Sequence, residues 1–137
     1  MRVFIDTNVF ISAIINPSGS PALVLEICAE LGNIGKLQVV VCDTVISELR
    51  RIVSEKFPGK EEALEKMFAI LKVKVVSKID EIAHVNVRDP YDETIVRSAM
   101  KHADILITGD KDILQCEHDS ALIILTPRQF LKMIGLE

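Results

Sequence analysis

The chain has 137 residues, 49% of them hydrophobic and 26% charged, with 20 acidic and 16 basic side chains and a formal net charge of −4 at pH 7. This composition predicts one globular domain over residues 1–137 with a mostly aliphatic core, since there is no Trp, one Tyr and five Phe. The three cysteines are widely spaced and exclude a disulfide framework, and no apolar run approaches the roughly 18 residues of a membrane span. We therefore expect a cytoplasmic protein without a membrane partner.

Short apolar runs bounded by turn residues alternate with helical patterns along the chain. In chain order, we expect a strand at 3–5, helices at 9–15 and 20–31, a strand at 38–42, helices at 44–56 and 60–71, a strand at 73–76, a helix at 89–102, strands at 105–108 and 121–125, and a last helix at 126–135. Strands that are apolar throughout are typical of parallel sheets buried on both faces. The alternation predicts an α/β fold with a five-stranded, mostly parallel sheet.

Four acids fall at one edge of this expected sheet. Asp6 ends the first strand, and Asp110 closely follows the fourth. If the strand order is 3-2-1-4-5, these two strands are neighbours at the point where the order reverses, which is where ligands bind. Glu48 lies one turn into the helix after the second strand, and Asp92 lies in the first turn of the helix that leads into the fourth. Because helix N-termini and strand carboxyl ends share one edge, we expect the four carboxylates to converge.

Such a cluster of carboxylates repels itself unless cations compensate it. One or two Mg²⁺ or Mn²⁺ ions suit oxygen ligands, and two such ions about 4 Å apart can bind the attacking water and the leaving oxygen of a phosphodiester. The acids therefore suggest phosphodiester hydrolysis. If four acids are held under metal, 16 acids remain against 16 bases, so the negative net charge does not exclude a nucleic-acid partner.

Each of the four acids also has a structural explanation when it is taken alone. Asp6 could cap the next helix, and Asp110 could build a turn. Asp92 suits a helix N-terminus through the dipole, and Glu48 could form a surface ion pair with one of the two arginines that follow it. Only their coincidence at one sheet edge favours a metal site.

Three polar neighbours of these acids have two alternative roles each. Asn8 either caps a helix or orients Asp6. Thr108 donates its hydroxyl proton either to Asp110 or to a substrate phosphate. Asp112 is either an additional metal ligand or a cap for the short turn that follows it.

The segments IDTNVFIS, SELRRIV and DPYDETIVRSAMKHADILITGDKDIL, together with the final short strand and helix, resemble the PIN-domain nuclease family over nearly the whole chain. Within this family, the chain is similar to the VapC-like toxins of prokaryotic toxin–antitoxin systems. The resemblance implies a metal-dependent ribonuclease with a three-layer α/β/α architecture. It also implies an antitoxin partner that covers the site.

The resemblance can be followed residue by residue. The family's acids match Asp6, Glu48, Asp92 and Asp110, with Asp112 as an additional acid that many members share. Family polar positions match Asn8 and Thr108. At position 91 the chain departs from the pattern, because Tyr91 stands where many relatives have an acid or a small polar residue.

The leading hypothesis is a ribonuclease toxin whose acids hold the metal, but the RNA contacts and protein interfaces stay open. Candidate phosphate contacts are the basic residues near the acids: Arg50, Arg51, Arg97 and Lys111. These side chains could equally balance neighbouring acids. Apolar faces at residues 21–31 and 60–71 could receive an antitoxin, build a homodimer or belong to the core.

Two other functions remain open. A phosphatase or phosphotransferase would use Asp6 as its nucleophile, but Asn8 stands where such enzymes usually carry a second Asp. A non-catalytic module would bind metal and RNA without turnover.

Overall fold

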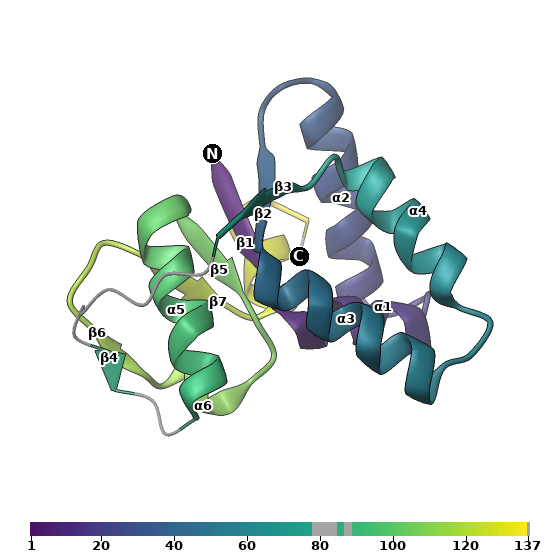
Figure 1. Cartoon of the computed structure of the whole chain (residues 1–137). Helices are drawn as coiled ribbons and strands as arrows, with labels where there is room; N and C mark the ends of the chain where they lie inside the picture. The colour runs from purple at the N-terminus through teal and green to yellow at the C-terminus, as the bar shows by residue number, and fades with distance from the viewer. Residues whose placement is uncertain (78–84, 87–88, 137) are drawn as a thin grey trace.

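The computed structural model describes residues 1–77 and 89–136, together with the backbone of residues 85 and 86. A five-stranded parallel sheet forms the middle layer, and helices cover both of its faces (Figure 1). Figure 1 shows α5 (Pro90–His102) on one side of the sheet. On the other side lie α1 (Thr7–Ile15), α2 (Ser20–Asn33), α3 (Asp43–Lys56) and α4 (Glu61–Leu71). The expected α/β/α architecture is confirmed.

The sheet has the order β3-β2-β1-β5-β7, and each neighbouring pair is parallel. Its strands are β1 (Arg2–Ile5), β2 (Gln38–Cys42), β3 (Lys74–Val76), β5 (Ile105–Ile107) and β7 (Ile123–Leu125). β1 is the central strand, because Val3 lies opposite Val39 of β2 on one side and Ile105 of β5 on the other. This is the predicted order 3-2-1-4-5 of the five strands. The order reverses between β1 and β5, so the ligand-binding crevice is expected at their carboxyl ends.

The apolar character of the central strands explains why they lie in the middle layer. Val3, Phe4 and Ile5 of β1 are fully buried, and β2 and β5 contribute equally apolar runs. Burial of each such side chain stabilises the fold by roughly 1.5–3 kcal/mol. Phe10 of α1 and Phe68 of α4 meet edge to face, with ring centroids 5.8 Å apart. Core packing thus fixes α1 and α4 above the sheet.

Capping side chains set where helices begin. Asp6 caps α1 with its own carboxylate, so the helix begins at Thr7, two residues before the predicted start. At α7 (Pro127–Met133), the Thr126 hydroxyl accepts from the Gln129 N–H at 3.1 Å, and the Gln129 side chain accepts from the Thr126 N–H at 2.9 Å. This reciprocal pair satisfies two N–H groups that a helix start otherwise leaves without partners.

Three short elements were not predicted from the sequence. α6 (Lys111–Leu114) follows β5, and β4 (Val85–Asn86) pairs antiparallel with β6 (Glu117–His118) in a separate two-stranded sheet. Strands of two residues and a single helical turn are too short to show a hydrophobic period. They therefore leave no pattern in the sequence that could announce them.

Among the described residues, no single helix is long and apolar enough to cross a membrane. α1 and α2 would meet the length and composition criteria together, but the chain bends by 110° between them.

Candidate metal centre

Asp6 lies buried at the carboxyl end of β1, with 3% of its surface exposed. Its backbone N–H donates to the carbonyl of Ile107, which extends the pairing of β1 with β5. One carboxylate oxygen, Oδ1, accepts from the Thr7 N–H at 2.7 Å, and Oδ2 accepts from the Thr108 hydroxyl at 2.8 Å. Asp6 thus caps α1 and also presents a fixed carboxylate at the sheet edge. The role as a helix cap and the role as a candidate metal ligand, which are alternatives in the sequence, are therefore compatible.

Burial raises the pKa of Asp6 to about 6, because a carboxylate loses hydration inside the protein. The hydrogen bonds from Thr108 and Thr7 oppose this change, while the negative charge of Asp110 adds to it. The pKa of Asp92 is raised further, to about 7, first by burial and then by the charges of neighbouring aspartates, above all Asp110. Both acids would be more easily ionised beside a cation.

Asp92, Asp110 and Asp112 bring their carboxylate oxygens within 4.8 Å of one another. Asp92 projects from the first turn of α5 and is 8% exposed. Asp110 caps α6 by accepting from the Asp112 N–H at 2.8 Å, so Asp112 is not the cap of this turn. Asp92 of α5, Asp110 before α6 and Asp112 in α6 therefore form a compact group of three oxygen donors.

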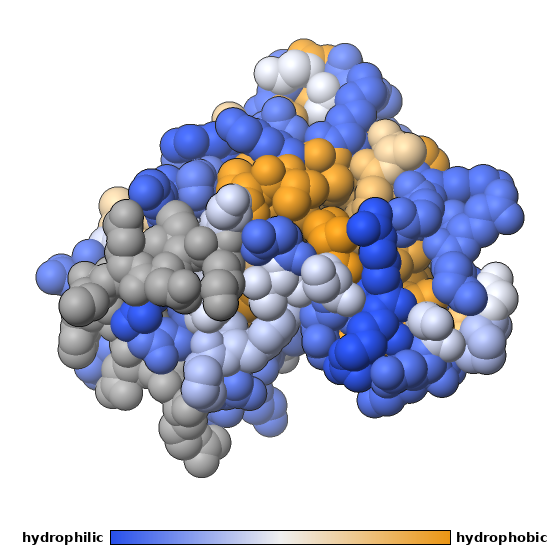
Figure 2. Space-filling model, viewed as in Figure 1, coloured by the Kyte–Doolittle hydropathy of each residue, from blue (hydrophilic) through white to orange (hydrophobic). Residues whose placement is uncertain are grey.

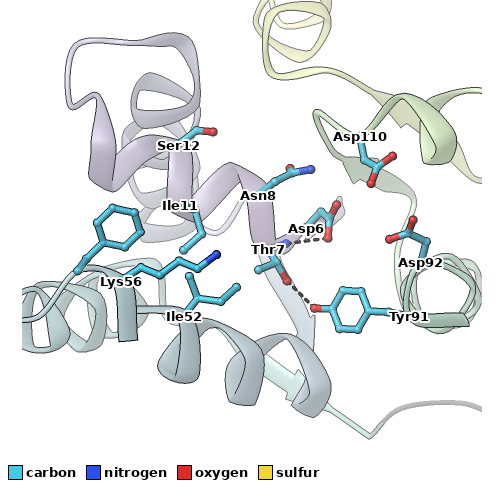
Figure 3. Close-up of a pocket in the computed structure, with 11 residues that line it drawn as sticks. Asp6, Thr7, Asn8, Ile11, Ser12, Ile52, Lys56, Tyr91, Asp92 and Asp110 are labelled. Carbon is cyan, nitrogen blue, oxygen red and sulfur yellow. Dashed lines mark hydrogen bonds between the residues drawn. The ribbon is translucent and has the colours of Figure 1, made fainter. Parts of the chain in front are cut away.

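Asp6, Asp92 and Asp110 line one cavity of about 390 Å³ at the carboxyl end of the central strands. Figure 3 shows Asp110 and Asp92 pointing toward one another, with Asp6 beside them at the start of α1. The cavity thus gathers acids from three remote parts of the chain. This is the crevice that the reversal of strand order predicts.

The donor set fits a hard divalent cation. All candidate ligand atoms are carboxylate oxygens, which Mg²⁺ and Mn²⁺ prefer over nitrogen or sulfur. Within the part of the chain that the structure describes, Asp6, Asp92 and Asp110 form no ion pair with a lysine or arginine. No ion pair among the described residues therefore offsets their mutual repulsion, and a bound divalent cation would offset it.

Glu48 is not gathered into this group. Its Oε1 pairs with Nη2 of Arg51 at 2.6 Å, one turn further along α3, and Arg51 also pairs with Glu55 at 2.9 Å. Glu48 lines a neighbouring cavity with Arg51, and Tyr91 lines both that cavity and the one containing Asp6. The ion pair with Arg51, which the sequence offered as the structural alternative, is what the side chain forms here.

Thr108 and Asn8 tie the chain together around Asp6. The Thr108 hydroxyl donates to Asp6 and accepts from the Asp110 N–H at 3.0 Å, so the expectation that it donates to Asp110 is wrong. Asn8 accepts from the Gly109 N–H at 3.1 Å through Oδ1, and within the described part of the chain it neither caps α1 nor forms a hydrogen bond with Asp6. Both residues fix the connection after β5 against the start of α1.

Three of the four basic residues proposed to contact RNA are engaged by glutamates. Arg50 pairs with Glu65 at 2.7 Å, and Arg97 pairs with Glu93 one turn earlier on α5. Arg51 is held by the two glutamates already described. Lys111 is the first residue of α6 and lies in the sequence between Asp110 and Asp112.

Tyr91 and Lys56 are among the further residues that line the acidic cavity, and the sequence makes neither of them a candidate site residue. The Tyr91 hydroxyl lies 2.6 Å from that of Thr7, and burial raises the pKa of this tyrosine. Lys56, the last residue of α3, extends along the opposite wall (Figure 3). In the sequence, Tyr91 is a departure from the family pattern that could alter substrate contacts, and Lys56 carries no signal beyond its place at a helix end.

Known proteins resemble this chain in sequence and in fold. An uncharacterized protein of Methanocaldococcus jannaschii, MJ1680, is 29% identical over 142 residues, covering 96% of this chain and 90% of that protein. A crystal structure of VapBC2 from Rickettsia felis, bound to a DNA fragment from their promoter, matches with a TM-score of 0.60 and 19% identity, over 92% of this chain and 98% of that one. The sequence model of the PIN domain matches residues 2–112, a span that includes every acid of the candidate site. The chain therefore belongs to the PIN domain family.

Proposed function

We propose that the protein is a ribonuclease that depends on Mg²⁺ or Mn²⁺ and acts as the toxin of a toxin–antitoxin pair. The observation that carries the proposal is the meeting of Asp6, Asp92 and Asp110 in one cavity, with Asp112 next to the last two. Membership of the PIN domain family supports a nuclease. The resemblance to VapC-like toxins supports RNA as the substrate.

The proposed metal ligands are Asp92, Asp110 and Asp112, with Asp6 holding a second ion or sharing the first. A bound divalent ion supplies charge compensation for the phosphodiester and activates water for attack. The chain itself contributes by holding the ligand side chains in position. Two hydrogen bonds fix the Asp6 carboxylate, and the N–H of Asp112 fixes that of Asp110. Preorganised ligands lower the cost of ordering the site when substrate arrives.

Glu48 is the proposed fourth family ligand, and it must leave Arg51 to reach the metal. An exposed ion pair of this kind contributes only about 0.2–1 kcal/mol. The cost of breaking it is therefore small beside the attraction of a divalent ion. Figure 3 shows that Tyr91 extends from α5 to Thr7. It lies on the side of the cavity that faces α3, the helix that carries Glu48.

The hydrogen bonds of Asp6 favour a ligand over the alternative role of nucleophile. Both of its oxygens already accept a hydrogen bond, and no lysine or arginine in the described residues pairs with it. A phosphotransferase of this kind usually carries a second Asp two residues after its nucleophile, where this chain has Asn8. A module that binds metal and RNA without turnover is distinguished by the cleavage experiment below.

A cognate antitoxin and a homodimer are further parts of the proposal. The matched Rickettsia felis structure is of a VapBC2 assembly. An apolar groove of about 380 Å³ between α2 and α4 is lined by Leu25, Met67 and Ile70, among others, and is available for such a partner. Figure 2 shows a hydrophobic patch on the same side of the sheet, over β3 and the end of α4, where Val75 is 51% exposed.

Cleavage of structured RNAs by the purified protein, with and without Mn²⁺, tests the proposed function. We expect wild type to cut only with metal, and Asp6→Asn to fold but not to cut. Asp119→Asn is the matched control, because Asp119 is an exposed acid outside the cavity and should cut like wild type. Cutting by Asp6→Asn at the wild-type rate, or RNA left intact by wild type with metal, would overturn the proposal.

A further inference from the structure

The acidic cavity has a second wall that carries no acid. Ile11 of α1 and Ile52, Lys56 and Phe57 at the end of α3 form this wall. Figure 3 shows the carboxylates on one side of the cavity and Ile11, Ile52 and Lys56 on the other, with the Lys56 amino group directed inward toward Thr7. The cavity is therefore polarised, with negative charge on one wall and a single positive charge on the other.

Lys56 differs from the three arginines near the site in having no acidic partner among the described residues. Arg50, Arg51 and Arg97 each pair with a glutamate. Within the described residues, no carboxylate lies in ion-pair distance of Lys56, and it is the only lysine or arginine that lines this cavity. A cation held at the mouth of an acidic site without a local partner is available to a ligand.

We propose that Lys56 binds a backbone phosphate of the RNA strand beside the one that is cut. This rests on the proposed ribonuclease function. A polyanion that enters a cavity lined with acids is repelled everywhere except at a cation. Metal ions on the acidic wall serve the scissile phosphate, and the opposite wall needs a cation of its own for the phosphate that follows.

The side chain suits this role. The lysine ammonium is a compact point charge on a flexible stem, which can follow a phosphate without demanding one geometry. Ile11, Ile52 and Phe57 give the same wall an apolar surface, and an aromatic ring offers a stacking face to a base of any sequence. The wall thus matches single-stranded RNA in charge and in polarity, and its contacts would not distinguish one base from another.

RNA binding is measured in the Asp6→Asn background with Mn²⁺, using a fluorescent single-stranded RNA across a range of salt concentrations. We expect Lys56→Gln to weaken binding several-fold for all sequences alike and to make the slope of log affinity against log salt shallower by about 0.7. Lys56→Arg should retain affinity and slope. Lys36→Gln is the control, because Lys36 is an exposed lysine in the loop before β2, at the opposite edge of the sheet.

In the otherwise wild-type enzyme, Lys56→Gln should raise KM for RNA with little change in kcat, and Mn²⁺ affinity should stay unchanged. An unchanged salt slope in Lys56→Gln, while wild type still cuts RNA, overturns this inference and leaves the proposed function standing. Tighter Mn²⁺ binding by the variant without loss of RNA affinity makes Lys56 an internal counter-ion of the acids and also overturns it. A wild type that neither binds nor cuts RNA overturns both.

Discussion

The hydroxyl of Thr108 donates a 2.8 Å hydrogen bond to Oδ2 of Asp6, and this bond joins residues 102 positions apart at the ends of neighbouring strands. The same hydroxyl oxygen accepts from the Asp110 N–H. One side chain thus sets the distance between two acids of the candidate site. The hydrogen bond that Thr108 donates also lowers the pKa of Asp6, although burial raises that pKa by more.

Replacing Thr108 by Val should therefore affect both metal binding and stability. Asp6 loses a donor and the Asp110 N–H loses its acceptor, so the pKa of Asp6 should rise and Mn²⁺ affinity at neutral pH should fall. The unfolding free energy should drop by about 1–3 kcal/mol, because buried polar groups are left unpaired. Calorimetric Mn²⁺ titration and urea unfolding measure the two effects. Thr108→Ser keeps the hydroxyl and should behave like wild type. Wild-type Mn²⁺ affinity and stability in Thr108→Val would show that the hydroxyl does not hold the two acids in place.

The metal-free protein should lose stability as pH rises from about 4 to about 7. Asp6 has a folded pKa of about 6 and Asp92 of about 7, both above the ordinary 3.8, so the folded state binds protons more tightly than the unfolded state. Stability is therefore greatest below the unfolded pKa and declines until the folded pKa is passed. For Asp6 alone the loss is on the order of 3 kcal/mol, since one pKa unit corresponds to about 1.4 kcal/mol.

Urea unfolding in EDTA across this pH range tests the expectation. Asp6→Asn removes the titrating group, so its stability should vary less with pH and should exceed that of wild type at neutral pH. Added Mn²⁺ should reverse the order at neutral pH by stabilising wild type. Identical pH profiles for wild type and Asp6→Asn in EDTA would show that Asp6 does not titrate in this range.

Glu48→Gln tests whether the glutamate bound to Arg51 is a metal ligand. If it is, the variant should bind Mn²⁺ more weakly, whereas Arg51→Ala should bind it at least as tightly as wild type because the carboxylate is released. Neither change should cost more than about 1 kcal/mol of stability, since the pair is exposed. Calorimetric titration of both variants separates the roles. Wild-type Mn²⁺ affinity in Glu48→Gln would leave Glu48 as a surface partner of Arg51 only.

The hydroxyl contact between Tyr91 and Thr7 should be worth about 1 kcal/mol. Tyr91→Phe and Thr7→Val should each destabilise the fold. The double variant should be destabilised by about 1 kcal/mol less than the sum of the two single changes. A double-mutant cycle of urea unfolding measures the coupling. Full additivity would mean that the hydroxyl groups do not stabilise one another. Mn²⁺ binding should be unaffected, because neither residue belongs to the proposed ligand set.

The sequence and the structure agree best where a feature depends on neighbours along the chain. The apolar runs predict all five strands of the main sheet to within two residues, and caps at Asp89 and Thr126 mark true helix starts. The placement of acids at one sheet edge also follows, because strand ends and helix starts must share it. The pairing of β4 with β6 could not be predicted, since two-residue strands carry no period.

The sequence by itself determined the α/β fold and, once the strand order 3-2-1-4-5 is assumed, the edge at which Asp6, Asp92 and Asp110 lie. Only the tertiary structure decided which partner each polar side chain takes: Thr108 turns to Asp6, Glu48 pairs with Arg51, and Lys56 enters the acidic cavity. Hydrophobic period and capping are local properties, and they can be read along the chain. Hydrogen bonds and ion pairs are chosen among groups a few ångströms apart in space, and that competition is settled only when the chain has folded.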